Sequence, residues 1–171
     1  MAKVFLGLGT NLGDKRRNLL TAVTNIEKKI GKITSLSSLY ETEPWGFKSE
    51  NPFLNAALCV ETSLEPFTIL HIIKEIETEM GRTRKAEDKT YSDRPIDIDI
   101  LLYDNMVMET EELTIPHPLM AERDFVMRPL AEIAGDTVHP VLRKELGELF
   151  HSLHQSKPPF CQASPEQSQV P

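Results

Sequence analysis

Cysteine is scarce in this sequence of 171 residues, which contains two. Cys59 lies in an apolar run typical of a strand and Cys161 lies in a polar tail, so the pair predicts neither a disulfide scaffold nor a metal site. Long apolar runs are missing too, since none approaches the ~20 residues that a membrane helix needs. The first residues also lack the charged-then-apolar build of a signal peptide. We therefore expect a cytoplasmic protein in a reducing compartment, with no membrane partner.

Two familiar nucleotide-binding motifs are absent. Gly7, Gly9 and Gly13 follow the spacing G-x-G-x-x-x-G, which is one residue longer than the dinucleotide fingerprint. No Walker A sequence occurs, so an ATP site in this chain would not be of the P-loop kind. Net positive charge is lacking as well. The formal charge of −7 argues against a nucleic-acid partner, because such proteins usually present a basic face.

The composition that remains is that of an ordinary globular domain, with 40% apolar and 26% charged residues. The length fits one domain, which we expect to span residues 1–154. The segment 155–171 is rich in proline, serine and glutamine and predicts a disordered tail.

Hydrophobic periodicity predicts both strands and helices along the chain. We expect strands over 4–8, 33–42, 53–62 and 95–103, and helices over 19–30, 66–80, 125–134 and 142–153. Asp104 and Asn105 predict a tight hairpin back into 106–108. Short turns between neighbouring strands favour antiparallel pairing. The fold class is therefore α+β, an antiparallel sheet covered by helices.

The segment 95–103 is the strongest strand. Its alternation directs Ile96, Ile98 and Ile100 into a core and places Asp97 and Asp99 side by side on the opposite face. Two carboxylates ~7 Å apart along a strand repel one another. A divalent cation such as magnesium removes that cost. The alternative is a solvated polar face on an ordinary amphipathic strand.

Positive charge gathers just before this strand. Five basic residues fall within thirteen positions: Arg82, Arg84, Lys85, Lys89 and Arg94. Guanidinium groups match phosphate oxygens and neutralise charge during phosphoryl transfer. Acidic residues interleave there, so a solvated charged loop is the alternative. Together with the paired aspartates, however, the segment favours a metal–nucleotide site.

An amide and several aromatic residues are candidates for holding a planar ligand. Asn55 shares a strand face with Phe53, and a buried amide must find hydrogen-bond partners. A flat heterocycle with alternating donors and acceptors would supply them, with Phe53, Trp45 or Phe125 on its plane. The alternative is that Asn55 bonds neighbouring backbone and that Trp45 anchors its loop. His117 lies between two prolines, which fix the backbone that carries its ring.

With these residues in view, the sequence resembles the hydroxymethyldihydropterin pyrophosphokinase family of folate biosynthesis. The resemblance extends from Val4 to about Phe150 and rests on ordered motifs. These are Gly7-Leu-Gly-Thr-Asn-Leu-Gly13, Tyr40-Glu-Thr-Glu-Pro-Trp-Gly46, Phe53-Leu-Asn-Ala-Ala57, Gly81-Arg-Thr-Arg-Lys85, Arg94-x-x-Asp97-Ile-Asp99, Pro116-His117 and Arg123-x-Phe125.

The resemblance implies a ferredoxin-like α+β sandwich that is usually monomeric. It also implies that the β,γ-pyrophosphoryl group of ATP moves to the 6-hydroxymethyl oxygen of 7,8-dihydropterin, giving AMP. Loops containing Asn11, Trp45 and Arg84 would close over the substrates and exclude water. Two rival interpretations stay open: phosphoryl or nucleotidyl transfer to another small alcohol, and a ferredoxin-like binding module without activity.

Residue roles follow from the resemblance by position. Asp97 and Asp99 would hold two Mg²⁺ ions, and Arg82 and Arg94 would contact the phosphates and support transfer. Around the nucleotide would lie Glu77, Arg84, Lys85, the backbone near Ile100, Thr114, His117 and Arg123. The pterin pocket would be lined by Thr42, Pro44, Trp45, Phe53, Asn55 and Phe125.

Overall fold

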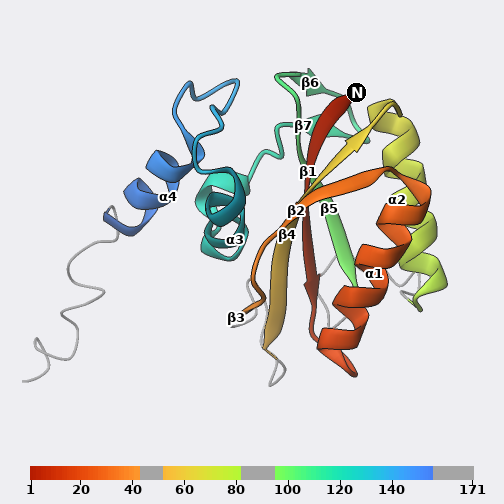
Figure 1. Cartoon of the computed structure of the whole chain (residues 1–171). Helices are drawn as coiled ribbons and strands as arrows, with labels where there is room; N and C mark the ends of the chain where they lie inside the picture. Colours follow the sequence, from red (N-terminus) through yellow and green to blue (C-terminus); the bar gives the residue numbers. More distant parts are fainter. Residues whose placement is uncertain (43–51, 82–94, 156–171) are drawn as a thin grey trace, which may run out of the picture.

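Five strands form one antiparallel sheet in the computed structural model, which describes residues 1–42, 52–81 and 95–155 (Figure 1). The strands are β1 (Ala2–Thr10), β2 (Lys32–Leu36), β3 (Tyr40–Thr42), β4 (Phe53–Thr62) and β5 (Asp97–Tyr103). Their order is β2-β4-β1-β5, and β3 pairs with β4 next to β2.

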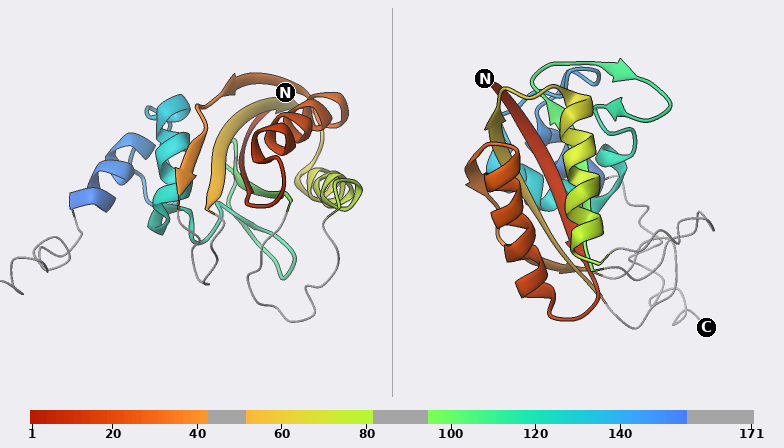
Figure 2. Two further views of the ribbon diagram at one scale, coloured as in Figure 1. Left: turned by 90° about the horizontal axis from the view of Figure 1, so that it is seen from below. Right: turned by 90° about the vertical axis from the view of Figure 1, so that its right-hand side faces the viewer.

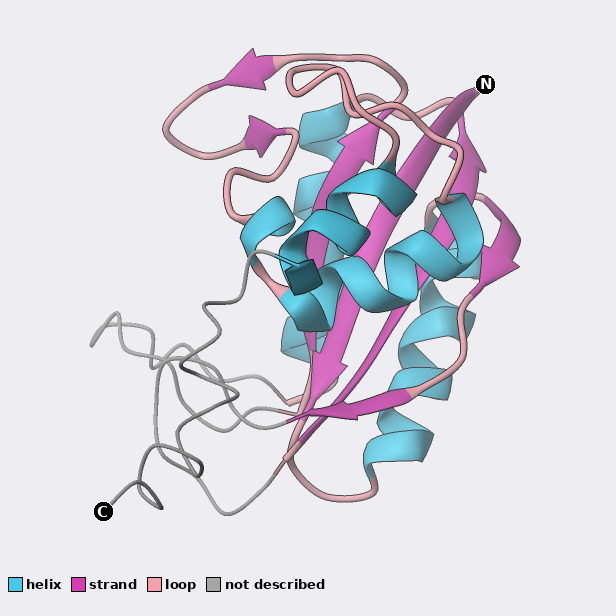
Figure 3. Cartoon of the chain, turned by 90° about the vertical axis from the view of Figure 1, so that its left-hand side faces the viewer, coloured by secondary structure: helices cyan, strands magenta, loops and turns pink. Residues whose placement is uncertain are grey.

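In the described part of the chain, helices cover both faces of this sheet (Figures 1 and 2). The first face is covered by α1 (Lys15–Lys29) and α2 (Pro66–Glu79). On the second face α3 (Asp124–Ala134) packs against the strands, and α4 (Leu146–Gln155) packs against α3 (Figure 3). The two crossovers β1-α1-β2 and β4-α2-β5 interleave in one sheet, so the predicted ferredoxin-like α+β fold is confirmed.

Local sequence explains where the first two helices begin. The Asp14 side chain accepts a hydrogen bond of 3.1 Å from the N–H of Arg17 and thereby caps α1. Pro66 occupies the first turn of α2, where its missing N–H costs no helical hydrogen bond. None of the helices in the described ranges is both long and apolar enough to cross a membrane.

Alternation along the strands produces two apolar cores. Leu6, Leu58 and Ile100 belong to the larger core beneath α1 and α2. Phe5 and Cys59 belong to the smaller core beneath α3. The smaller core does not include the C-terminal end of β1 or the adjoining ends of β4 and β5. Polar side chains share the second face there, which positions the candidate site.

The expected strand 33–42 is divided into β2 and β3, and Ser37 lies between them. The Ser37 N–H donates to the Ala57 carbonyl at 2.9 Å, and the Ser37 hydroxyl accepts from the Ala57 N–H at 2.9 Å. A side-chain oxygen therefore replaces one backbone partner of the ladder. The regular ladder is interrupted there, and it resumes in β3, where Tyr40 is opposite Asn55.

The expected turn at Asp104 and Asn105 forms, with the N–H of Met106 donating to the Tyr103 carbonyl at 2.9 Å, but the expected hairpin into 106–108 is wrong because that segment does not pair with β5. Asp104 adopts a positive φ of 48° and its Oδ1 accepts a hydrogen bond of 2.8 Å from the N–H of Lys3, which holds the turn against β1. The chain then forms β6 (Met108–Glu109), which pairs with β7 (Thr114–Ile115) in a separate two-stranded sheet. A short 3-10 helix, η2 (Met120–Glu122), precedes α3.

Candidate active site

Two partly buried carboxylates lie on the second face of the edge strand β5, as predicted. Asp97 and Asp99 flank Ile98, whose side chain is buried in the larger core. In the register with β1, Gly9 is opposite Asp97 and Gly7 is opposite Asp99. Because glycine has no side chain, β1 places no side chain opposite either carboxylate; the Leu101 side chain borders Gly7, and those of Asn55 and Phe53 border Gly9. A slip of one residue would bury the charges, so the register of this strand is strongly specified.

The backbone between the two aspartates is held by a side chain of α2. Glu77 of α2 accepts a hydrogen bond of 2.8 Å from the N–H of Ile98 through its Oε2. The bond joins a helix to the strand segment from which Asp97 and Asp99 project. The structure therefore brings Glu77 next to the paired aspartates, while its predicted place beside the nucleotide stays a prediction.

The predicted pterin-pocket residues of β3 and β4 lie together on the second face. Asn55 is 4% exposed, and its Nδ2 donates a short hydrogen bond of 2.6 Å to Oγ1 of Thr42. Thr42 is opposite Phe53 in the β3–β4 register. A Cβ built on Gly9 would lie 3.0 Å from Asn55 Oδ1 and 3.5 Å from Phe53. Gly9 thus forms a floor between the amide and the carboxylate of Asp97.

An arginine and an aromatic ring face each other at the start of α3. The guanidinium carbon of Arg123 lies 5.7 Å from the ring centroid of Phe125. Arg123 is buried, with 7% of its surface exposed, although it carries a permanent charge. A buried guanidinium beside an aromatic face is suited to anions and to planar groups.

His117 lies in the same electrostatic neighbourhood. The backbone N–H of His117 donates to the Leu101 carbonyl at 3.0 Å, and the ring Nδ1 accepts from the backbone N–H of Leu119 at 3.2 Å. Burial lowers the pKa of His117 below its ordinary 6.5, the charge of Arg123 lowers it further, and the charge of Asp97 opposes this. The ring is therefore neutral at pH 7, and because Nδ1 is an acceptor its proton is on Nε2.

The remaining predicted site residues are Thr114, Ile100 and a group that the structure does not describe. Thr114 lies in β7, and the Ile100 side chain is buried beneath α1 and α2, which leaves its backbone for the predicted contact. Six predicted site residues lie outside the described residues: Pro44, Trp45, Arg82, Arg84, Lys85 and Arg94.

The donor set suits magnesium. Asp97 and Asp99 supply hard carboxylate oxygens on one strand face. Magnesium is commonly held by one or two carboxylates, with water and substrate phosphates completing its shell. Within the described ranges no group of three or more His, Cys, Asp or Glu residues gathers as a metal site.

Sequence reasoning assigned no part in this site to Gly9, Tyr40 or Glu132. Gly9 was considered only as part of a glycine motif, and its position opposite Asn55 and Asp97 emerges from strand pairing. Tyr40 and Glu132 are 92 residues apart in sequence and joined by a hydrogen bond of 2.6 Å. The sequence contained one weak signal for Tyr40, namely that it lies in the same motif as the predicted pocket residue Thr42.

The fold and these groups define a small α+β enzyme-like protein, with carboxylate, amide and aromatic groups at one end of its sheet. The family model described as 7,8-dihydro-6-hydroxymethylpterin-pyrophosphokinase matches residues 5–135. The chain belongs to this family.

Full-length relatives agree with the family model. The chain is 48% identical over 141 residues to 2-amino-4-hydroxy-6-hydroxymethyldihydropteridine pyrophosphokinase of Porphyromonas gingivalis, covering 82% of this chain and 95% of that one. It is 42% identical over 161 residues to the protein of the same name from Aquifex aeolicus, covering 94% and 97%.

Solved structures support the fold. An HPPK-DHPS crystallised with substrates has a TM-score of 0.71 at 16% identity, covering 91% of this chain and 44% of that one. Wild-type HPPK-DHPS of Plasmodium falciparum with pteroate has a TM-score of 0.72 at 19% identity, covering 99% and 44%. The chain spans less than half of the length of these two proteins.

Proposed function

We propose that this protein transfers the β,γ-pyrophosphoryl group of ATP to the hydroxymethyl group of 6-hydroxymethyl-7,8-dihydropterin, a step of folate biosynthesis. The hydroxymethyl oxygen forms a bond to the β-phosphorus while the bond from that phosphorus to the bridging oxygen of AMP breaks, and the hydroxyl proton is released. The observation that carries the proposal is the arrangement around Gly9. An amide for the acceptor lies on one side of it and a carboxylate pair for the phosphates lies on the other.

The carboxylate side holds the phosphates of ATP. Asp97 and Asp99 hold two Mg²⁺ ions, which supply positive charge to the phosphate oxygens when bound. Glu77 keeps the strand between the two aspartates in place through the N–H of Ile98. Arg82 and Arg94 contact the transferring group, in keeping with the charge that such a transfer develops.

The remaining nucleotide contacts come from residues spread over the sequence segment 77–123. His117 offers its Nε2–H, and Arg123 offers a buried positive charge at the same place. The set of residues around ATP is Glu77, Arg84, Lys85, the backbone near Ile100, Thr114, His117 and Arg123.

The amide side holds the pterin. Its ring edge carries alternating donors and acceptors, which Asn55 can match once its Nδ2 is anchored on Thr42. Phe53 and Phe125 are the described aromatic residues for the plane of the ring, and Pro44 and Trp45 complete the pocket. Such a pocket rejects ring systems that leave its polar groups unpaired.

We also propose that the protein acts as a monomer in the cytoplasm. The reaction needs one chain only, since the carboxylates and the amide belong to the same sheet. Sedimentation of the purified protein with and without ATP would measure its oligomeric state.

The deciding experiment mixes the protein with ATP, Mg²⁺ and 6-hydroxymethyl-7,8-dihydropterin and separates the nucleotides. We expect AMP to appear in step with the pterin pyrophosphate. ADP as the product would instead indicate phosphoryl transfer to an alcohol. Magnesium-dependent ATP binding without turnover would indicate a binding module.

The acceptor is tested by Asn55→Ala, which should abolish most turnover with the pterin. Asn105→Ala is the matched control, because it removes an exposed amide from the opposite end of the sheet face. Equal activity of the two variants would contradict the assignment of Asn55 to the pterin.

A further inference from the structure

A carboxylate of α3 binds the connection between β2 and β3. Glu132 Oε1 accepts a hydrogen bond of 2.6 Å from the Tyr40 hydroxyl. The N–H of Ser38 lies 3.0 Å from Oε1 and 3.2 Å from Oε2, and the Ser38 hydroxyl donates to Oε2 at 3.0 Å. Three donors from two neighbouring residues therefore converge on one ionised group, which makes these bonds stronger than neutral ones.

The bound segment leads directly to the amide of the site. Tyr40 is opposite Asn55 in the β3–β4 register, and Thr42 follows two residues later on the same face. Thr42 is the residue whose Oγ1 accepts from Nδ2 of Asn55. A shift of Tyr40 would therefore move Thr42 with it, because the two belong to one extended strand.

The strand that carries Thr42 is short. β3 has three residues and pairs with β4, at the edge of the sheet, in the part of the chain that the structure describes. A strand of this length has few ladder hydrogen bonds of its own. The exposed hydrogen bonds to Glu132 therefore add to the few contacts that hold β3 in register.

The same helix carries the aromatic residue of the site. Phe125 and Glu132 are seven residues apart on α3, two turns along one side of the helix. One end of this side contacts β3 through Glu132, and the other end bears Phe125 beside Arg123. The carboxylate therefore links the strand that orients the amide to the helix that supplies a ring, in addition to the packing of α3 on the smaller core.

We propose that Glu132, acting through Tyr40 and Ser38, is a positioning residue for the pterin substrate. It holds β3 so that Thr42 keeps the Asn55 amide oriented toward the pterin. This inference rests on the proposed function, because it concerns the acceptor half of the same site.

The titration behaviour of the pair agrees with this role. The hydrogen bond to Glu132 raises the pKa of Tyr40, with a further contribution from burial. The bond from Tyr40 lowers the pKa of Glu132, and the bonds from Ser38 act in the same direction. The carboxylate is therefore ionised and the phenol protonated across the pH range of an enzyme assay.

The test compares Glu132→Gln with Tyr40→Phe. The glutamine keeps the size of the side chain but removes its charge and one acceptor oxygen. We expect KM for the pterin to rise roughly tenfold in Glu132→Gln, the effect of losing about one charge-assisted hydrogen bond. KM for ATP and kcat should each stay within about twofold. Tyr40→Phe should show the same pattern with a smaller rise.

Two matched controls isolate the interaction. Asp136→Asn removes an exposed carboxylate just after α3, and Tyr103→Phe removes a phenol that donates to the Leu64 carbonyl at 2.8 Å on another part of the molecule. Both should leave KM for the pterin unchanged. In the double variant of Glu132 and Tyr40 the rise should be smaller than the product of the single rises, because the two groups act as one.

Binding without turnover gives an independent measure. Calorimetry of 6-hydroxymethylpterin, with Mg²⁺ and a non-hydrolysable ATP analogue present, should show weaker pterin binding in Glu132→Gln and unchanged binding of the analogue. A parallel loss for both ligands together with a lower Tm would overturn the positioning role. Wild-type affinity for the pterin in Glu132→Gln would overturn it too. No AMP formation by the wild-type protein would instead contradict the proposed function.

Discussion

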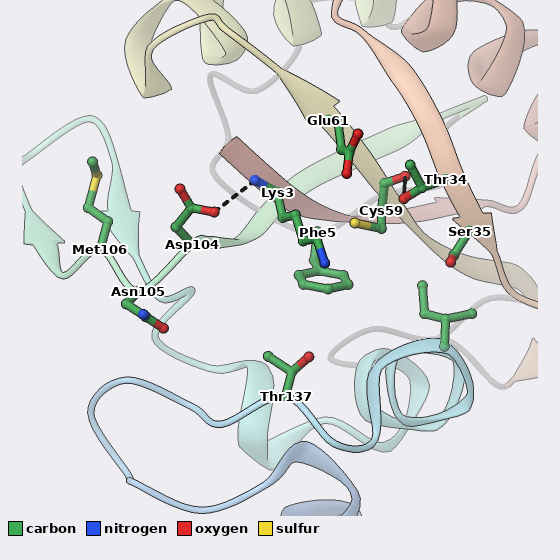
Figure 4. Close-up of a pocket in the computed structure, with 11 residues that line it drawn as sticks. Lys3, Phe5, Thr34, Ser35, Cys59, Glu61, Asp104, Asn105, Met106 and Thr137 are labelled. Carbon is green, nitrogen blue, oxygen red and sulfur yellow. Dashed lines mark hydrogen bonds between the residues drawn. The ribbon is translucent and has the colours of Figure 1, made fainter. Parts of the chain in front are cut away.

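The two ends of the second sheet face are both polar, yet they are built differently from the same strands. One end carries the candidate active site around Gly9. The other end borders a cavity of about 740 Å³ between the sheet and the C-terminal end of α3 (Figure 4). Lys3 and Phe5 of β1 and Cys59 and Glu61 of β4 line this cavity.

The difference lies in what stands opposite each charge. At the cavity, Lys3 of β1 and Glu61 of β4 are opposite in register, so residues of opposite charge occupy adjacent positions on neighbouring strands. Asp104 accepts from the N–H of Lys3 (Figure 4). At the site, the residues opposite Asp97 and Asp99 are glycines, which bring neither charge nor bulk. The two ends thus differ in that β1 places a charged side chain next to a charged residue at the cavity and no side chain next to the aspartates at the site.

The largest expected effect comes from removing a carboxylate at the site end. Asp97→Ala should lower kcat/KM for AMP formation by on the order of a thousandfold, because electrostatic stabilisation of a transferring phosphate group is worth several kcal/mol. Glu61→Gln, the same loss of charge at the cavity end, should stay within about twofold of the wild-type protein. Comparable losses in the two variants would mean that the ends do not differ as we infer.

The second expected effect is a difference in activity between Gly9→Ala and Gly7→Ala. Gly9→Ala would place a methyl 3.0 Å from Asn55 Oδ1, so the amide must shift. We expect kcat/KM for the pterin to fall on the order of tenfold to a hundredfold, since a displacement of about 1 Å near reacting groups is costly. In Gly7→Ala the Cβ would meet Leu101 at 3.4 Å, an ordinary contact, and the loss should be smaller. Steady-state kinetics with varied pterin would rank the two, and the reverse ranking would remove Gly9 from the floor of the site.

The free energy of unfolding is expected to depend on pH through His139, which follows α3 in the sequence. His139 is 5% exposed, and its Nδ1 accepts from the N–H groups of Val141 and Leu142 at 3.2 and 3.0 Å. Burial lowers the pKa of His139 below its ordinary 6.5. The unfolded chain therefore takes up this proton more readily than the folded one. The stabilisation is complete above pH 6.5 and is lost as pH falls through the lower pKa of the folded state.

Thermal denaturation at pH 7 and pH 5 would measure this contribution. In His139→Asn, whose amide oxygen still accepts hydrogen bonds but does not titrate, the fall in Tm between these pH values should be smaller by about 2–4 °C. Some fall should persist, because the pKa of His117 is lowered too. An unchanged fall in the variant would mean that His139 does not contribute.

The smallest effect is expected from the thiol at the cavity. Burial raises the pKa of Cys59, so little thiolate is present at pH 7. In a Cys161→Ser background, reaction of Cys59 with a thiol reagent should be at least about tenfold slower in the folded protein than in urea. AMP formation should not change after labelling. Inactivation on labelling would connect the cavity to the site and weaken the comparison.

The sequence predicted those features that depend on local pattern. Alternation placed Asp97 and Asp99 opposite a buried face, and it placed Asn55 on the side of Phe53. The structure agrees on both. The predicted fold and family are confirmed. The roles of individual site residues stay predictions.

Features that depend on which segments pair with one another could not be predicted from the sequence. The β2–β3 division depends on Ser37 taking a backbone position opposite Ala57, which propensity does not reveal. The expected hairpin after β5 was wrong because Asp104 binds β1 instead. The contact of Glu132 with Tyr40 joins residues that are close only once the sheet and α3 have assembled.

The bond from Ile98 to Glu77 has a consequence for the protein in concentrated solution. β5 is an edge strand, and its outward amides and carbonyls are a template for a strand of another molecule. Here the N–H of Ile98 is taken by a carboxylate and the carbonyl of Leu101 is taken by the N–H of His117. Glu77, which holds the backbone between the aspartates, and the backbone of His117 thereby also blunt this edge against intermolecular strand addition.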